Sequence, residues 1–165
     1  MDKKKTILLG HVDSSPHALA RGAMLAAAYA ALTLALAPVS FGAFQFRVSE
    51  ALTVLPWFYP EAVPGLFVGC LVANLFGGNG LLDVVFGSLA TLGAALLSRR
   101  MKNPWLVPLP PVVVNALVIG AVLSYVLDLP FWMTAGEVGL GQLGACYVLG
   151  MPLLLFLKRR LDLRG

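Results

Sequence analysis

Long uninterrupted runs of apolar residues dominate the chain. Four of them approach or exceed the roughly 20 residues that an α-helix needs to cross a bilayer: Ala18–Ala37, Leu81–Leu97, Leu106–Leu127 and Gly136–Leu157. The strands of a membrane barrel would instead alternate apolar and polar residues over about ten positions. The pattern therefore predicts an all-α membrane protein whose helices span the bilayer.

The stretch from Phe44 to Phe76 is also apolar, but prolines interrupt it. It corresponds to about 50 Å of α-helix, which is short of two perpendicular crossings of a ~30 Å hydrocarbon core. The stretch can form a re-entrant element or two short spans. We favour two short spans, Arg47–Tyr59 and Glu61–Phe76, broken near Pro60, because neighbouring helices can shield a short helix.

Basic residues decide how many spans there are. The lysines near the N-terminus and the group Arg99, Arg100 and Lys102 should both be cytoplasmic, so an even number of spans separates them. The total is then six, both termini are cytoplasmic, and Arg47 is the one basic residue among the twelve that lies outside. We predict a cytoplasmic tail at residues 1–15, a six-helix transmembrane domain at 16–160 and a second tail at 161–165. The first helix should begin at Ser15-Pro16, a cap residue followed by proline.

Composition excludes several classes of function. Hydrophobic residues make up 59% of the 165 residues and charged residues only 12%, against about 25% in soluble domains. The net charge of +4 comes from the flanks of the spans, so we expect a protein of the cell membrane and no nucleic-acid partner. No P-loop, His-Glu-x-x-His or Gly-x-Ser-x-Gly motif occurs. Cys70 and Cys146 fall within apolar runs and are interpreted as small buried hydrophobes.

These absences predict a binding subunit that is not an enzyme and that carries no cofactor or metal. Two alternatives stay open. One is a self-sufficient small transporter or channel that acts as an oligomer, because six helices are few for alternating access. The other is a membrane enzyme or a scaffold.

Polar residues at membrane depth are costly, so they are functional candidates. Eight occur within or at the outer ends of the spans: Arg47, Glu50, Asn74, Asp83, Asn115, Asp128, Glu137 and Gln142. Arg47 and Glu50 are three residues apart, so on a helix they share a face and can neutralise each other. Asp83 and Glu137 are then without basic partners, which favours a cation or a hydrogen-bond donor as ligand. The two asparagines serve either as links between helices or as substrate contacts.

The first span also has a pattern of small residues. One row recurs every four positions, at Ala23, Ala27, Ala31 and Ala35. A parallel row contains Gly22, Ala26 and Ala30. Small residues at this spacing let another helix approach closely, either a helix of a partner or one of the protein's own bundle.

Three segments carry a resemblance to a known family. Gln45–Pro56, Gly80–Leu92 and Pro111–Ala116 resemble the queuosine precursor transporter family QueT, whose members are substrate-binding S components of energy-coupling factor (ECF) transporters. The resemblance extends from about Ala18 to Arg160. It implies a six-helix S-component bundle, an extracellular substrate pocket, and partnership with a transmembrane T component and two ATPase subunits. It also implies that the alanine row of the first helix docks on the T component.

The implied substrate is a deazaguanine precursor of queuosine, or queuine. A 7-deazaguanine presents N1–H and a 2-amino group side by side, and one carboxylate can accept both hydrogen bonds. Glu50, Asp83 and Glu137 are the candidate acids. Asn74 or Asn115 would meet the ring acceptors, Trp57 or Phe58 would stack on the ring, and Arg47 would contact a carbonyl or hold Glu50 in place.

Overall fold

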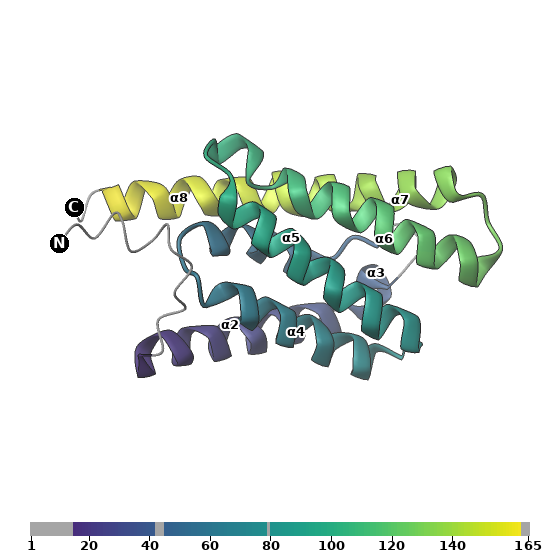
Figure 1. Cartoon of the computed structure of the whole chain (residues 1–165), viewed down its shortest axis with the longest axis horizontal. Coiled ribbons are helices and arrows are strands. Elements are labelled where there is room, and N and C mark those ends of the chain that lie inside the picture. Colours follow the sequence, from purple (N-terminus) through teal and green to yellow (C-terminus); the bar gives the residue numbers. More distant parts are fainter. Residues whose placement is uncertain (1–14, 42–44, 79, 163–165) are drawn as a thin grey trace.

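The computed structural model describes residues 15–41, 45–78 and 80–162, and every regular element in them is helical (Figure 1). The elements are α2 (Pro16–Ala35), α3 (Ala37–Ser40), the 3₁₀ helix η1 (Val48–Trp57), α4 (Ala62–Gly77), the π-helix η2 (Asp83–Gly87), α5 (Ser88–Arg100), η3 (Pro104–Leu106), α6 (Leu109–Leu127), α7 (Phe131–Leu143), the π-helix η4 (Gly144–Gly150) and α8 (Met151–Asp162). The all-α prediction is therefore confirmed. The predicted tails, apart from Ser15 and residues 161–162, lie outside the described residues.

The start of α2 follows from its sequence as expected. The hydroxyl oxygen of Ser15 accepts a hydrogen bond from the backbone N–H of Ala18 at 3.2 Å, and Pro16 occupies the first helical position. Serine satisfies an N–H that has no intrahelical partner, and proline has no N–H to satisfy there. The predicted helix start is thus confirmed.

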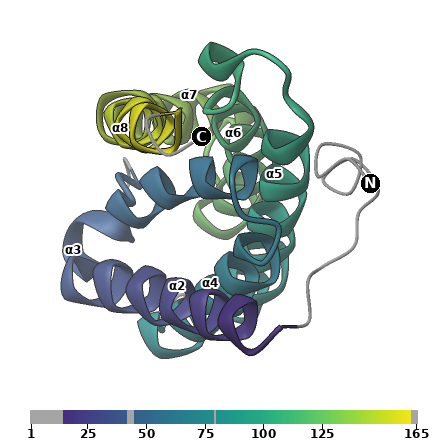
Figure 2. The same ribbon diagram turned by 90° about the vertical axis from the view of Figure 1, so that its left-hand side faces the viewer.

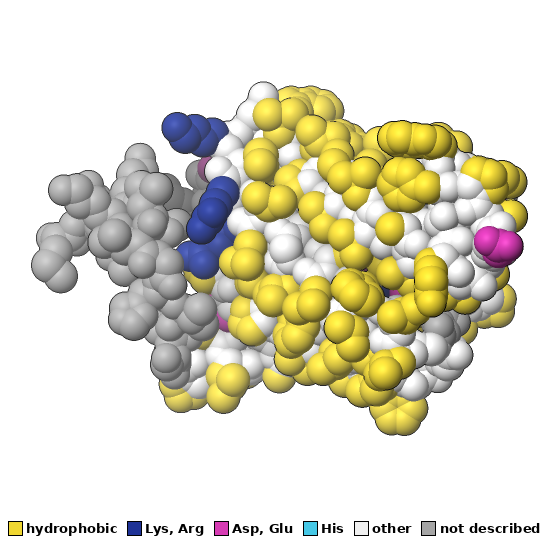
Figure 3. All heavy atoms as spheres, turned by 45° about the vertical axis from the view of Figure 1, so that its right-hand side comes forward, with side chains coloured by type: hydrophobic (Ala, Val, Ile, Leu, Met, Phe, Trp, Pro, Cys, Tyr) yellow, Lys and Arg dark blue, Asp and Glu magenta, His cyan; other side chains and the backbone are white. Residues whose placement is uncertain are grey.

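The helices run back and forth between two ends of an elongated bundle. Arg21 near the start of α2 forms an ion pair with Glu61, just before α4, at 2.6 Å. This basic end also holds the last turns of α5 and of α8, both of which contain two arginines. Lys and Arg side chains gather at one edge of the molecule in Figure 3, and an acidic side chain lies at the opposite edge. Between these edges the visible face is largely hydrophobic.

Three described helices are long and apolar enough to cross a membrane: Pro16–Ala35, Pro104–Leu127 and the continuous helix Phe131–Asp162. Ala62–Gly77 is apolar but shorter. Together with the exposed hydrophobic side chains, these helices identify a membrane protein. The count of six crossings stays a prediction.

The proline-rich region forms the centre of the bundle. η1 is buried along almost its whole length, between α2, α5, α8 and η4. A 3₁₀ helix rises about 2.0 Å per residue against 1.5 Å in an α-helix, so this short segment reaches roughly a third further than an α-helix would. The chain then turns at Pro60 before α4 begins, close to the predicted break.

α2 and α4 pack very closely because both present small residues (Figure 2). A Cβ atom at Gly65 would lie 2.5 Å from the carbonyl oxygen of Gly22, and one at Gly69 would lie 2.6 Å from that of Ala26. The row of Gly22 and Ala26 is therefore an internal contact. The adjacent row faces away from the bundle, and its four members are exposed: Ala23, Ala27, Ala31 and Ala35.

At the basic end, side chains bond to the loop between α5 and α6. The indole N–H of Trp57 donates a hydrogen bond to the carbonyl oxygen of Met101 at 2.8 Å. The hydroxyl of Tyr147 donates one to the backbone carbonyl oxygen of Trp105 at 3.1 Å. Beneath this loop a hydrophobic cluster includes Val107 and Leu154, which are both fully buried. In the part of the chain that the structure describes, none of the buried side-chain polar atoms without a hydrogen-bond partner belongs to this loop or to the hydrophobic cluster beneath it.

Candidate functional site

Buried polar side chains gather between the middle of the bundle and the end opposite the basic residues. They come from α2, η1, α4, η2, α5 and α6, so the cluster unites segments that are far apart in the sequence. We call the following set the polar cluster: Tyr29, Thr33, Arg47, Ser49, Glu50, Cys70, Asn74, Asp83, Thr91 and Asn115. All ten side chains belong to buried residues.

Arg47 and Asp83 form a buried ion pair within the polar cluster. Nη2 of Arg47 lies 3.0 Å from Oδ2 of Asp83, and the two side chains are only 3% and 6% exposed. Nε of Arg47 also donates to the carbonyl oxygen of Ser40 at 3.3 Å, and the guanidinium lies 5.0 Å from the centre of the Phe41 ring. Asp83 is thus tied to the segment that follows α2.

This pairing differs from the arrangement that the sequence favoured. Arg47 does not share a helical face with Glu50, because its backbone is extended (φ −85°, ψ 101°) and it precedes η1. Its side chain therefore points to Asp83, 36 residues away in the sequence. Asp83 has a basic partner, and the expectation that it lacks one is wrong.

Glu50 has no basic ion-pair partner among the residues that the structure describes. One of its carboxylate oxygens accepts a hydrogen bond from the hydroxyl of Tyr29, while Oε2 is buried without a hydrogen-bond partner in the described part of the chain. Thr91 and Asn115 lie beside the same carboxyl group. The hydroxyl groups of Thr33 and Ser49 are 2.6 Å apart and bind α2 to the start of η1. These contacts hold Glu50 against α2 in the interior.

Asn74 and Asn115 contribute further unpaired atoms. Nδ2 of Asn74 donates to the carbonyl oxygen of Asp83 at 3.0 Å, but its Oδ1 has no partner among the described residues. Nδ2 of Asn115 likewise has none there. Buried polar atoms are almost always hydrogen-bonded, so three such atoms in one cluster need an explanation. Oδ1 of Asn74 is an acceptor with which a ligand could pair, whereas Nδ2 of Asn115 lies beside the Glu50 carboxyl group that holds the other unpaired acceptor.

The π-helix η2 shapes the wall of the polar cluster that carries Asp83. A Cβ atom at Gly87 would lie 2.9 Å from Nδ2 of Asn74 and 3.3 Å from Oδ1 of Asp83, so glycine makes room for both side chains. The carbonyl oxygen of Gly87 accepts from the hydroxyl of Thr91 at 3.1 Å. π-helical turns inside longer helices occur frequently at functional sites.

Some of the residues chosen from the sequence lie elsewhere. Trp57 and Phe58 pack in the hydrophobic cluster at the basic end, so the structure does not bring them to Glu50 or Asp83. Glu137 on α7 is partly exposed, and Asp128 is exposed after the end of α6. The structure does bring together five of the predicted residues: Arg47, Glu50, Asn74, Asp83 and Asn115.

Sequence reasoning missed the partners of these residues. Tyr29 and Thr33 are one turn apart on α2 and both are completely buried. Their spacing within an Ala- and Leu-rich helix was an available signal for an inward polar face. Cys70 lies within the polar cluster and accepts a hydrogen bond from Thr91 at 3.2 Å, which its position in an apolar run does not indicate. Across residues 15–41, 45–78 and 80–162, no group of three or more His, Cys, Asp or Glu side chains could hold a metal ion.

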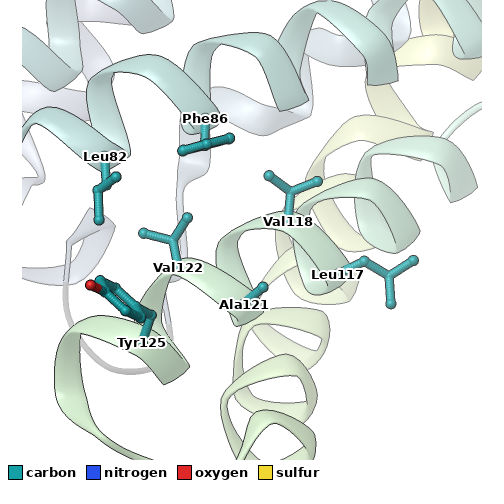
Figure 4. A pocket seen from close by; sticks show the side chains of 7 residues that line it. All are labelled: Leu82, Phe86, Leu117, Val118, Ala121, Val122 and Tyr125. Carbon is teal, nitrogen blue, oxygen red and sulfur yellow. The ribbon is translucent and has the colours of Figure 1, made fainter.

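A separate groove lies on the outer surface between η2 and α6 (Figure 4). Its lining is apolar apart from one tyrosine hydroxyl and consists of Leu82, Phe86, Leu117, Val118, Ala121, Val122 and Tyr125. Leu82 directly precedes Asp83, yet its side chain lines the outside of the helix while Asp83 is buried. This groove offers few polar groups to a ligand, so the polar cluster is the better candidate site.

Comparison with known proteins gives two findings. Residues 19–159 match the family model described as QueT transporter. The chain is also 29% identical over 157 residues to the queuosine precursor transporter QueT of Lactococcus lactis subsp. cremoris (strain MG1363), an alignment that covers 86% of this chain and 92% of that protein. No solved structure matches the chain.

Proposed function

The chain belongs to the QueT transporter family, so it is a transporter protein and not an enzyme, and we propose that it is the substrate-binding S component of an ECF importer. In this proposal it captures a queuosine precursor, a 7-deazaguanine base or queuine, at the extracellular side of the cell membrane. The substrate class follows the name of the Lactococcus relative, a queuosine precursor transporter. The remaining support comes from the polar cluster and from the surface of α2.

One observation carries the binding role, namely the unpaired buried atoms of the polar cluster. Oε2 of Glu50 and Oδ1 of Asn74 are acceptors, and Nδ2 of Asn115 is a donor. A 7-deazaguanine carries N–H donors on one edge and a carbonyl acceptor on the next, which complements such a set. Binding would satisfy groups that are costly to leave unpaired in the interior.

The role as a subunit rests on the sequence and on the outward row of α2. The chain has no P-loop motif, so a partner must hydrolyse ATP for an ATP-driven import. The alanines of the outward row are exposed at every fourth position, which allows close approach of another helix. We propose that Ala23, Ala27, Ala31 and Ala35 dock on the T component, which joins this chain to two ATPase subunits.

We further propose six crossings of the cell membrane with both termini in the cytoplasm. The gathering of basic side chains at one end supports this orientation (Figure 3). A cysteine placed at Lys102 in a protein without Cys70 and Cys146 should react only with reagents inside the cell. A cysteine placed at Pro130 should react only with reagents outside. Reaction of both positions from the same side would contradict the proposed topology.

The binding role has a direct test. The purified protein should bind a 7-deazaguanine base in a calorimetric titration, and native mass spectrometry should detect a base of that class carried through purification. Asn115→Ala should weaken binding about tenfold, because one hydrogen-bond acceptor of the base is left unpaired. Asn103→Ala is the matched control, since Asn103 only caps η3 at the other end. Equal affinities of both variants and of the wild type would exclude the polar cluster as the site.

The subunit role has its own test. Expression with candidate T-component and ATPase subunits should give a complex that co-purifies, and uptake should require ATP. Uptake by the chain alone in liposomes would instead support a self-sufficient oligomeric transporter.

A further inference from the structure

Two helices at the basic end change from exposed apolar side chains to basic ones within one turn. In α5 the exposed Leu97 precedes Arg99 and Arg100. In α8 the exposed Phe156 precedes residues 158–160, which are Lys-Arg-Arg. Hydrocarbon covers the exposed apolar side chains of a membrane helix, whereas basic side chains reach into the polar layer beside it. The two changes therefore mark the level at which the hydrocarbon ends and the lipid headgroups begin.

The loop between α5 and α6 lies at this end too. It packs on α8 through the hydrophobic cluster that contains Val107 and Leu154, so Lys102 in the loop is close to the last turns of α8. Trp105 on η3 is 61% exposed, and its backbone N–H donates to the side-chain oxygen of Asn103 at 3.0 Å. Tryptophan is enriched at the boundary between hydrocarbon and headgroups, because its ring is apolar and its indole N–H is a donor. The loop thus presents an interfacial anchor beside a basic side chain.

The basic side chains at this level are not compensated by acids in the described residues. We call the following six the basic surface: Arg99, Arg100, Lys102, Lys158, Arg159 and Arg160. Residues 15–41, 45–78 and 80–162 contain two ion pairs, and neither involves a member of this set. α5, the loop after it and α8 carry these six basic residues and one acidic residue, Asp162. The basic surface therefore has a strong excess of positive charge directly beside exposed apolar side chains (Figure 3).

We infer that the basic surface binds the phosphate groups of anionic membrane lipids, whose acyl chains lie against the exposed apolar side chains of α5 and α8. The inference goes beyond the proposed function and does not depend on the identity of the substrate. Clusters of Lys and Arg at the ends of membrane helices attract anionic lipids, and each such residue contributes separately. Arginine is especially suited to phosphate, since its planar fork donates two parallel hydrogen bonds.

The juxtaposition of charge and apolar surface selects a lipid over other anions. The guanidinium of Arg160 lies 5.2 Å from the centre of the Phe156 ring, so the charge is held directly over an exposed apolar side chain. A free phosphate would pair with the charge and leave the ring uncovered. A zwitterionic lipid would cover the ring but would bring no net negative charge. An anionic lipid meets both requirements with one molecule.

Three small probes test the inference on the purified wild-type protein. They are dioctanoyl-phosphatidylglycerol, dioctanoyl-phosphatidylcholine and glycerol 3-phosphate, titrated in a non-ionic detergent and followed by native mass spectrometry. The anionic lipid should bind about tenfold to a hundredfold more tightly than the zwitterionic one, because each basic residue in the headgroup layer is worth about fivefold in affinity. Equal affinities of the two lipids would overturn the inference and would favour an acidic protein as the occupant. Glycerol 3-phosphate that binds as tightly as the anionic lipid would also overturn it, because the apolar side chains would then play no part.

Two triple variants assign the lipid preference to the basic surface. One neutralises its members on α5 and the loop, and the other neutralises those on α8: Arg99→Gln/Arg100→Gln/Lys102→Gln and Lys158→Gln/Arg159→Gln/Arg160→Gln. Each should lower the ratio of the two lipid affinities about fivefold and leave the affinity for the zwitterionic lipid unchanged. Arg21→Gln is the matched control, because Arg21 lies at the same end but is already paired with Glu61 at 2.6 Å. An undiminished ratio in both triple variants would overturn the inference. If neither variant folds, the wild-type affinities for the three probes decide.

Discussion

α2 presents small residues on two adjacent sides, and the described residues of the chain occupy only one of these sides. On the inward side, Gly22 and Ala26 lie in close contact with Gly65 and Gly69 of α4, and the polar groups of Tyr29 and Thr33 are satisfied. The outward side has the same four-residue spacing, but its alanines are exposed. Spacing alone therefore indicates a surface for close approach, and the position of the neighbouring helix decides whether that surface is internal.

The comparison gives an expectation about substitutions. Substitutions of residues in the interior of the bundle, on the inward side of α2, should lower the free energy of unfolding. The contacts there are made by the chain itself. Changes on the outward side should leave the isolated protein stable and affect only what docks there. Four substitutions, taken from the largest expected effect on stability to the smallest, test this difference.

Asp83→Asn should have the largest effect. It leaves the buried guanidinium of Arg47 without its counter-charge, a loss of about 3–5 kcal/mol for a broken buried pair. Thermal unfolding in detergent should show a marked decrease in stability, and ligand binding should be lost with the fold. The double variant Arg47→Met/Asp83→Leu removes both charges and should regain part of the stability. A stable single variant would mean that the ion pair does not hold the polar cluster together.

Gly69→Ala tests the inward side of α2 itself. The added Cβ would lie 2.6 Å from the carbonyl oxygen of Ala26, a backbone atom that cannot move aside without separating α2 from α4. Overpacking of this kind costs about 1–3 kcal/mol. Gly93→Ala on α5 is the matched control, because no atom outside its own helical turn lies within 4 Å of its Cβ position. Equal stabilities of the two variants would show that the contact between α2 and α4 is looser than the structure indicates.

The sequence predicted local features better than pairings. The cap at Ser15, the break at Pro60 and the depth of Asn74 and Asn115 follow from neighbouring residues and from the apolar runs. The partner of Arg47 does not, because an ion pair across 36 positions depends on how the helices pack. A local rule for residues three apart instead suggested Glu50.

The inward side of α2 also shows that local sequence rules do not identify which segments contact each other. Both rows of small residues are equally suited to close packing, and only the glycines of α4 distinguish them. The stacking role predicted for Trp57 is subject to the same limit, since aromatic residues at the end of a span serve either as interfacial anchors or as a stacking surface. The 3₁₀ form of η1 and its central position place Trp57 at the basic end.

Trp57→Phe separates packing in the interior from binding. It keeps an aromatic ring in the hydrophobic cluster but removes the hydrogen bond to the carbonyl oxygen of Met101. We expect a loss of about 0.5–1.5 kcal/mol in the free energy of unfolding. Affinity for a 7-deazaguanine base should not change, because the polar cluster lies elsewhere in the bundle. If the affinity falls by more than the loss of stability accounts for, Trp57 contributes to the binding site.

Ala27→Leu should have the smallest effect on stability and a large effect on assembly. Its neighbour in the sequence, Ala26, contacts Gly69, whereas Ala27 is exposed on the outward side, so we expect the larger side chain to leave the packing of the bundle unchanged. Surface substitutions of this kind change stability by less than about 0.5 kcal/mol. Substrate binding in detergent should stay intact, while co-purification with the T component and uptake should be lost, because the added bulk blocks the close approach of another helix. Leu117→Ala, on the exposed face of α6, is a control that should leave assembly unchanged. If Ala27→Leu reduces binding and uptake in the same proportion, the outward row belongs to the packing of the bundle, and the two sides of α2 do not differ in function.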